Sequence, residues 1–280
     1  MIDKQIMKSR FSKSAKSYDR FANVQKKMAH HLLKMIQSDY PNGLPKEAKI
    51  LEIGCGTGYL TRLLRQLLPH VSITAVDIAP GMIKEAKDKL NDENTIYVCA
   101  DIEEIELVQS YDLIISNATF QWFTQAETTL RRLTESLNTN GILYFSTFGQ
   151  DTFCELNEAY CYAKEKLELP NVERLGQRLY SLHEWRILCN QSLMSVDYHI
   201  SACEEKEYEY FDCVRDFFTS IRKIGANNSN AGIYCQSPSF FKELIQRYEG
   251  KYAENGRVKV TYHCIYFQIR KMPSRKMLSL

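Results

Sequence analysis

The sequence predicts an α/β protein built on an open sheet that is wound on both faces. An apolar run over residues 49–53 stops at a Gly-x-Gly-x-Gly turn, and short apolar runs then alternate with helical patterns up to residue 148. Such alternation is typical of parallel strands joined by crossover helices. After residue 148 the pattern changes to long helical stretches. We therefore expect a doubly wound, mostly parallel seven-stranded Rossmann-like sheet with a helical lid.

The elements of the first half follow from spacing and turn residues. The first forty residues are expected to be helical, because Phe11, Ala15, Tyr18 and Ala22 recur at three- or four-residue spacing, and Pro41-Asn42-Gly43 ends this region. Strands are then expected at 49–53, 71–76, 95–99, 111–116 and 141–147, and helices at 58–68, 80–90 and 123–138.

The second half is expected to alternate between lid and core. A charged helical segment covers 150–180, and a helix at 181–190 and a strand at 193–200 return to the core. A helical segment at 204–256 is rich in Tyr, Phe and Arg, and a β-branched and aromatic strand follows at 257–270. The expected divisions are a lid segment (1–45), a ligand-binding core (46–148), a lid insertion (149–180), a core helix and strand (181–203), a second lid insertion (204–256), and a last strand with its tail (257–280).

Composition narrows the class of protein. The 280 residues are 44% hydrophobic, enough for one core and a smaller subdomain. A net charge of +2 is too small to indicate a nucleic-acid partner. No run approaches the roughly 18 apolar residues of a membrane span, and the start lacks a signal-peptide core. The nine cysteines include no Cys-x-x-Cys pair, so we expect reduced thiols, no metal and a cytoplasmic location.

The glycine turn predicts a nucleoside site. Gly54, Gly56 and Gly58 follow a strand and open a helix, so a ligand can approach the backbone at the helix N-terminus. The next strand ends at Asp77, a hydroxyl acceptor. An ordinary α/β turn remains the alternative for three glycines alone.

The ligand indicated by this turn is S-adenosylmethionine (SAM). A dinucleotide fingerprint needs a glycine where this chain has Tyr59, and no Gly-Lys-Ser/Thr follows. Glu52 would repel a pyrophosphate but suits a cationic ammonium or sulfonium group, and Asp77 suits a ribose. Asp101, after the third strand, is expected to accept from the adenine amino group beside Ile102; a helix N-cap for the segment 103–106 is the alternative.

The end of the fourth strand is expected to face the reacting methyl group through Gln121 and Trp122. Asn117 is followed by Ala118 and Thr119 rather than by two prolines, which disfavours methylation of base amino groups. Alternatively, Trp122 and Phe123 pack the next helix. The six histidines are scattered without ligand spacing, so no general base is indicated. A carboxylate nucleophile, with a pKa near ~4, would need none.

A carboxylate substrate needs a positioning donor, and arginine has the best shape for it. The candidates are Arg174, Arg178, Arg215, Arg222 and Lys223. Arg222 is the first choice, because its helix stops sharply at Gly225.

Several segments carry a family resemblance. The glycine loop and Asp77 resemble class I SAM-dependent methyltransferases. Four further segments resemble the malonyl-[acyl-carrier protein] O-methyltransferase family of biotin synthesis: Phe11–Asp19, Ser116–Trp122, Ser146–Leu156 and Ile224–Asn227. The resemblance runs from about residue 8 to about residue 270. It implies methylation of the free carboxylate of a malonyl thioester on acyl-carrier protein, giving the methyl ester that primes the pimeloyl chain.

The resemblance also implies roles for particular residues. Tyr18 would close over SAM, and Gln121, Trp122, Thr147 and Phe148 would line the methyl-transfer pocket. The resemblance does not fix the arginine that binds the carboxylate, so Arg222 stays the first choice from the residues alone. The residues expected to hold SAM are Tyr18, Glu52, Gly54, Cys55, Gly56, Asp77, Ile78, Met82, Asp101, Ile102 and Asn117. A basic rim for the acidic carrier protein would comprise Lys13, Lys16, Arg20, Lys26, Lys27, Arg215, Arg222 and Lys223.

Three alternatives to this function stay open. The chain could methylate a small free acid such as an aconitate-like triacid, or a quinone precursor. It could also bind SAM as a regulator without catalysis. No nucleic-acid or membrane partner is expected.

Overall fold

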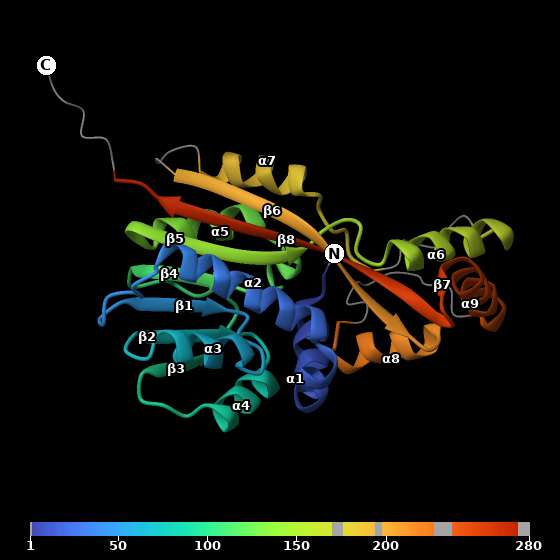
Figure 1. Ribbon diagram of the computed structural model, residues 1–280, viewed down its shortest axis with the longest axis horizontal. Coiled ribbons are helices and arrows are strands. Elements are labelled where there is room, and N and C mark those ends of the chain that lie inside the picture. The colour runs from blue at the N-terminus through green and yellow to red at the C-terminus, as the bar shows by residue number, and fades with distance from the viewer. Residues whose placement is uncertain (1, 170–175, 194–197, 227–236, 274–280) are drawn as a thin grey trace, which may run out of the picture.

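The computed structural model describes residues 2–169, 176–193, 198–226 and 237–273. Its centre is a sheet with the strand order β3-β2-β1-β4-β5-β8-β6, beside which the two-residue β7 pairs with β8 (Figure 1). The strands are β1 (Lys49–Ile53), β2 (Ser72–Asp77), β3 (Thr95–Cys99), β4 (Tyr111–Ser116), β5 (Leu137–Phe148), β6 (Tyr198–Phe211), β7 (Ala253–Glu254) and β8 (Arg257–Lys271). β1 to β5 pair in parallel, whereas β8 runs antiparallel to both β5 and β6. The predicted fold class is confirmed.

Helices cover both faces of the sheet and form two large hydrophobic clusters. On one face lie α2 (Asn23–Asp39) and α3 (Tyr59–Leu67), and on the other lie α5 (Ala126–Glu135) and α7 (Leu182–Ser192). α4 (Pro80–Lys89) joins β2 to β3, and a short 3₁₀ turn, η1 (Phe120–Trp122), follows β4. In the second cluster Phe145 stacks between Phe120 and Phe267 with centroid distances of 3.9 and 4.8 Å. This packing holds η1, and with it the end of β4, against one face of the sheet.

Four helices gather at the carboxyl ends of the parallel strands, at the right of Figure 1. They are α1 (Lys4–Phe21), α6 (Cys154–Lys166), α8 (Val214–Lys223) and α9 (Pro238–Tyr252), and we call them the lid. β8 pairs with β5 only from Cys264 to Arg270, but its pairing with β6 continues to Val258 opposite Phe211. The β6–β8 arm therefore leaves the core sheet and joins α8 and α9 to it.

The main error of the sequence prediction lies in this arm. Residues 204–211 were expected to be helical and the strand was expected at 193–200, but β6 runs from Tyr198 to Phe211. β6 is an edge strand, so charged and aromatic side chains occupy both of its faces and mimic a polar helix. The helix predicted at 123–138 is also shorter, because β5 begins at Leu137. Strands 49–53, 95–99 and 111–116 are confirmed. No described helix combines the length and apolar character that crossing a membrane requires.

Candidate active site

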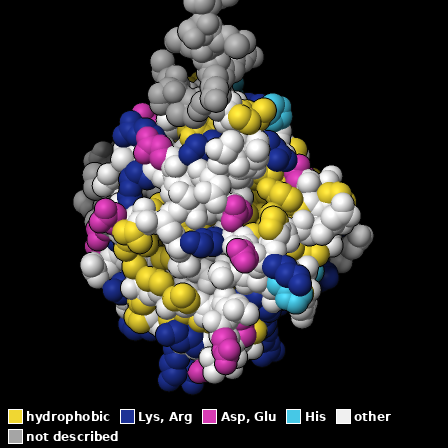
Figure 2. All heavy atoms as spheres, turned by 90° about the vertical axis from the view of Figure 1, so that its left-hand side faces the viewer, with side chains coloured by type: hydrophobic (Ala, Val, Ile, Leu, Met, Phe, Trp, Pro, Cys, Tyr) yellow, Lys and Arg dark blue, Asp and Glu magenta, His cyan; other side chains and the backbone are white. Residues whose placement is uncertain are grey.

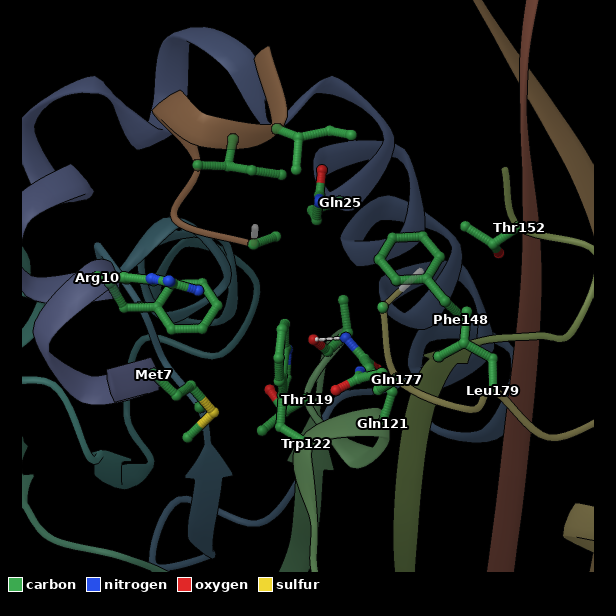
Figure 3. Close-up of a pocket in the computed structure, with 18 of the residues that line it drawn as sticks. Met7, Arg10, Gln25, Thr119, Gln121, Trp122, Phe148, Thr152, Gln177 and Leu179 are labelled. Carbon is green, nitrogen blue, oxygen red and sulfur yellow. Dashed lines mark hydrogen bonds between the residues drawn. The ribbon is translucent and has the colours of Figure 1, made fainter. Parts of the chain in front are cut away.

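A cavity of about 1000 Å³ lies between the carboxyl ends of the strands and the lid (Figure 3). One end is formed by the glycine loop and by the residues after β2 and β3. The other end is formed by apolar side chains of α6, α8 and α9. The position is the one at which open α/β sheets bind ligands.

One side of the glycine loop is open to the cavity. Gly54 and Gly56 have φ angles of +66° and +54° and line the cavity. A Cβ on Gly54 would overlap the side chain of Thr119, whereas a Cβ on Gly56 would meet no atom within 4 Å. The loop is held from below, because the N–H groups of Gly54 and Cys55 both donate to the carbonyl of Val76, at 2.8 and 3.1 Å. A ligand can therefore lie directly on the backbone at Gly56.

Asp77 and Tyr18 meet beside this loop. Asp77 accepts from the N–H groups of Gly56, at 2.9 Å, and Ala79, at 2.8 Å. Burial raises the pKa of Asp77 to about 6. Burial also raises the pKa of the Tyr18 hydroxyl, and the nearby Asp77 carboxylate raises it further. Ile78 and Met82 line the same end of the cavity, so these predicted SAM residues are brought together with Gly54 and Gly56.

Glu52 and Cys55 are predicted SAM residues that lie beneath the loop and do not line the cavity. This corrects the expectation that they contact the ligand. Glu52 is 1% exposed, and its Oε2 has no hydrogen-bond partner among the described residues. Burial raises the pKa of Glu52 to about 8. Burial therefore keeps Glu52 mostly protonated at neutral pH, and a cationic ligand nearby would favour its ionised form without touching it.

Asp101 and Ile102, which follow β3, also line the cavity. Asp101 Oδ1 accepts from the N–H of Glu103 at 3.0 Å, but residues 102–104 form a turn and not a helix, so Asp101 is not a helix N-cap. The ammonium of Lys4, on α1, contacts the carboxylates of Asp101 and Glu103. Asp101 thus lines the cavity and also ties α1 to the core.

The end of β4 presents two amide side chains whose orientations are fixed. Asn117 Nδ2 donates to the carbonyl of Gln25 at 2.9 Å, and Ser146 Oγ donates to Asn117 Oδ1 at 2.8 Å. Gln121 Nε2 donates to the carbonyl of Ala118 at 2.6 Å. Figure 3 shows Gln121, Trp122 and Phe148 around the cavity, as predicted.

Two predicted reaction-site residues lie outside the cavity wall. Thr147 is fully buried, and its Oγ1 donates to Gln121 Oε1 at 3.1 Å, so it positions Gln121 instead of lining the pocket. Arg222 is exposed on α8 and does not line the cavity, which corrects its predicted place at the site. The alternatives Arg215 and Lys223 are exposed as well. Arg174 and Asn227 lie outside the described residues.

Sequence reasoning missed most of the contribution of α1. Lys4, Met7, Phe11 and Tyr18 line the cavity at helical spacing, and Arg10 lies beside them. Phe11 meets the edge of Trp122 with a centroid distance of 5.4 Å. The signal was present in this spacing, but a sequence does not tell which side of an N-terminal helix will face a ligand.

The lid end of the cavity is apolar. Its wall includes Phe148, Phe153, Leu156, Tyr160, Phe218, Ile221, Phe240, Leu244 and Tyr262. No histidine is among the described residues that line the cavity. The cavity therefore has an acidic end at Asp77 and Asp101, which we call the nucleoside end, and an apolar end that excludes water. Neither end has an imidazole base among the described residues.

Comparison with known proteins agrees with this geometry. The methyltransferase domain family matches residues 51–145. Malonyl-[acyl-carrier protein] O-methyltransferase of Priestia megaterium is 49% identical over 97% of this chain and 99% of its own length. The protein of that name from Anoxybacillus flavithermus is 49% identical over 96% of this chain and 98% of its own.

Solved structures support the fold alone. The YcgJ protein of Bacillus subtilis has a TM-score of 0.58 at 18% identity and matches 88% of this chain and all of its own. A Bacillus halodurans protein whose description names a methyltransferase has a TM-score of 0.59 at 14% identity, over 88% of this chain and 99% of its own.

Proposed function

Because the chain belongs to the malonyl-[acyl-carrier protein] O-methyltransferase family, we propose that it methylates the free carboxylate of a malonyl thioester on acyl-carrier protein. The near full-length identity to these relatives carries the proposal. The product would be the methyl ester that primes pimeloyl-chain synthesis for biotin. A cytoplasmic location, where such a carrier would be met, is part of the same proposal.

The chain is a SAM-dependent methyltransferase, and the described residues fit this cofactor. The open space over Gly56 and the acceptor Asp77 suit an adenosine group, and a cationic chain beside the buried Glu52 would lower the raised pKa of that carboxyl group. When bound, SAM supplies a methyl group activated by its sulfonium. We propose that Tyr18, Gly54, Gly56, Asp77, Ile78, Met82, Asp101, Ile102 and Asn117 hold it, and that Glu52 acts from beneath the loop.

The absence of a histidine from the described cavity wall favours a carboxylate nucleophile. A carboxylate is already ionised at neutral pH, so the chain need not remove a proton from it. The work left to the protein is to orient the two reactants and to exclude water. Gln121 and Trp122 would orient the substrate, and the apolar side chains of α6, α8 and α9 would exclude water.

The acidic carrier would dock where α1 and α8 meet. Ser14 and Ser17 of α1 donate to the carbonyls of Arg222 and Lys223, at 3.3 and 2.8 Å, so the two helices lie side by side. The two helices of this seam carry exposed basic side chains, namely Lys13, Lys16 and Arg20 on α1 and Arg215, Arg222 and Lys223 on α8. Of the other predicted rim residues, Lys27 pairs with Glu207 at 2.5 Å, so its charge is partly neutralised.

The face opposite the lid offers no comparable field. In Figure 2, which views the molecule from the left-hand side of Figure 1, Lys and Arg side chains intermingle with Asp and Glu. Mixed signs do not steer an acidic partner over a distance, whereas a patch of one sign does.

The test of the reaction is transfer of label. SAM labelled on its methyl group would be mixed with the enzyme and with malonyl-, acetyl- or succinyl-acyl-carrier protein. We expect label on the malonyl carrier in a base-labile ester, and none on the acetyl carrier, which has no free carboxylate. Equal label on all three carriers, or label on none, would refute the substrate assignment.

A second experiment separates a carrier substrate from a small free acid. The double variant Lys13→Glu, Arg222→Glu reverses charge on both sides of the seam. It is expected to raise KM for malonyl-acyl-carrier protein and to leave the affinity for S-adenosylhomocysteine unchanged. An unchanged KM for the carrier, together with turnover of a small triacid, would favour the small-acid alternative.

A further inference from the structure

We propose that Arg10 binds the carboxylate of the substrate and aligns it for methyl transfer, an assignment that rests on the function proposed above. Arg10 lies on α1 and lines the cavity together with Trp122 and Met7. Figure 3 shows Arg10 at the wall of the cavity across from Phe148. Its neighbour Phe11 meets the edge of Trp122 with a centroid distance of 5.4 Å, so this turn of α1 lies beside a residue that would orient the reacting group.

The charges around the cavity single out Arg10. Lys4 and Arg10 are the basic residues among the described side chains that line the cavity. The ammonium of Lys4 lies between the carboxylates of Asp101 and Glu103, at the nucleoside end. Arg10 lies elsewhere on the wall, one residue before Phe11, which contacts Trp122.

An anionic substrate needs such a cation, because the cavity is otherwise acidic. Asp77, Asp101 and Glu103 line it and would repel a carboxylate. The apolar end of the cavity, with Phe148, Phe218 and similar side chains, carries no charged side chain among the residues that the structure describes. In such surroundings a planar guanidinium can bind a carboxylate with two parallel hydrogen bonds, which an ammonium cannot do.

The backbone of Arg10 is held in place from two sides. A Cβ on Gly225, after α8, would lie 3.0 Å from the Arg10 carbonyl oxygen, so the two segments touch. On the other side Gly81, in α4, packs against the backbone of Ser12. The side chain of Arg10 therefore starts from a fixed point, as a residue that positions a substrate requires.

The test compares malonyl-acyl-carrier protein with its methyl ester as ligands of the enzyme saturated with S-adenosylhomocysteine. The ester keeps the carrier and the thioester but lacks the negative charge. Wild type is expected to bind the acid more tightly than the ester. Arg10→Gln should lower the affinity for the acid about 10- to 100-fold and leave that for the ester unchanged. Arg10→Lys, which keeps the charge but loses the fork, should restore part of the preference.

Arg222→Gln is the matched control, since Arg222 is an exposed arginine of the seam. It should weaken binding of acid and ester by the same factor. The affinity for S-adenosylhomocysteine and the melting temperature, measured for each variant, report on folding. If Arg10→Gln failed to fold, the same comparison with Arg10→Lys would decide.

An unchanged preference for the acid in Arg10→Gln, or equal losses for acid and ester, would overturn the assignment of Arg10. A different result would overturn the proposed function itself. In that case the wild-type enzyme would neither bind nor methylate malonyl-acyl-carrier protein, although it binds S-adenosylhomocysteine.

Discussion

Asp77 serves two roles at the level of single residues. Its oxygens accept from the N–H groups of Gly56 and Ala79, which shapes the loop, and it faces the cavity, where a ribose needs an acceptor. The backbone donors orient the carboxylate before any ligand arrives. The raised pKa of about 6 means that this acceptor loses its charge under mildly acidic conditions.

Asp77→Asn should therefore weaken binding of S-adenosylhomocysteine by about 1.5–3 kcal/mol, the usual value of hydrogen bonds to a charged group. In wild type the affinity should also fall as the pH drops below about 6, and the variant should lack this dependence. Isothermal titration calorimetry at pH 5, 6 and 7.5 measures both effects. Equal affinities of the two proteins at pH 7.5 would contradict a role of Asp77 in binding.

Glu52 makes the stability of the ligand-free protein depend on pH. Its pKa is about 8 in the folded protein and 4.5 in a model peptide, so the folded state holds a proton that the unfolded state releases. The bound proton therefore contributes its full share to the free energy of unfolding below pH 4.5, and this contribution is lost as the pH rises toward 8. Glu52→Gln removes this contribution. Relative to wild type, the variant should gain about 2 kcal/mol in free energy of unfolding between pH 6 and pH 8.

Urea unfolding of both ligand-free proteins at pH 6, 7 and 8 gives this difference directly. A difference that stayed constant over the range would show that Glu52 titrates normally.

The residues of the glycine loop were predictable because their role is local. Gly54, Gly56 and Asp77 lie within one β-α-β unit, so their spacing in the sequence predicts that they lie together in the fold. The positions of Arg10 and Arg222 relative to the cavity were not predictable, because they depend on how α1 packs against α4 and α8, more than 50 residues away in sequence. No periodicity encodes which of two surface helices turns an arginine inward.

Among the elements, α1 depends on close contact with its neighbours. Gly81 lies within α4, and a Cβ there would overlap the backbone of Ser12. A glycine within a helix normally costs about 0.5–1 kcal/mol relative to alanine, so its presence at this position reflects the contact. β6, in contrast, could not be predicted from its local sequence, because its charged side chains fit an edge strand but also fit a polar helix.

Gly81→Ala and Gly250→Ala form a matched pair, because both glycines lie in helices and have ordinary φ angles. Gly250 has no atom within 4 Å of its added Cβ, so its substitution should stabilise by about 0.5–1 kcal/mol. Gly81→Ala should instead destabilise and weaken binding of S-adenosylhomocysteine, because α1 and Tyr18 must move. Thermal unfolding and calorimetry measure the two effects. Stabilisation by both substitutions would refute the close contact.

At the scale of the whole molecule, the described residues form two large hydrophobic clusters and one small one. The small cluster consists of Ala15, Ala79 and Met82, with Phe11, Tyr18 and Ile78 packed against it, and it attaches α1 to the core. α1 buries Met7 and Ala15, whereas α2 buries seven residues over a similar length. Local stability follows buried apolar contact, so α1 should open more readily than α2.

Binding of S-adenosylhomocysteine should slow amide hydrogen exchange in α1 and leave exchange in α2 nearly unchanged. The reason is that Lys4, Met7, Phe11 and Tyr18 line the cavity and gain a ligand to pack against. Exchange measured by mass spectrometry on peptides from 4–21 and 23–39 tests this. Equal protection of both helices would indicate that α1 is already closed without a ligand.

The helix α1 carries both Tyr18, proposed to bind the cofactor, and Arg10, proposed to bind the substrate, on the wall of one cavity. A ligand that fixes the helix through Tyr18 also places Arg10, so the conformational entropy of α1 is lost only once for two binding events. The two affinities are then coupled, and the coupling is reciprocal. We therefore expect S-adenosylhomocysteine to raise the affinity for the carrier, and the carrier to raise the affinity for S-adenosylhomocysteine by the same factor.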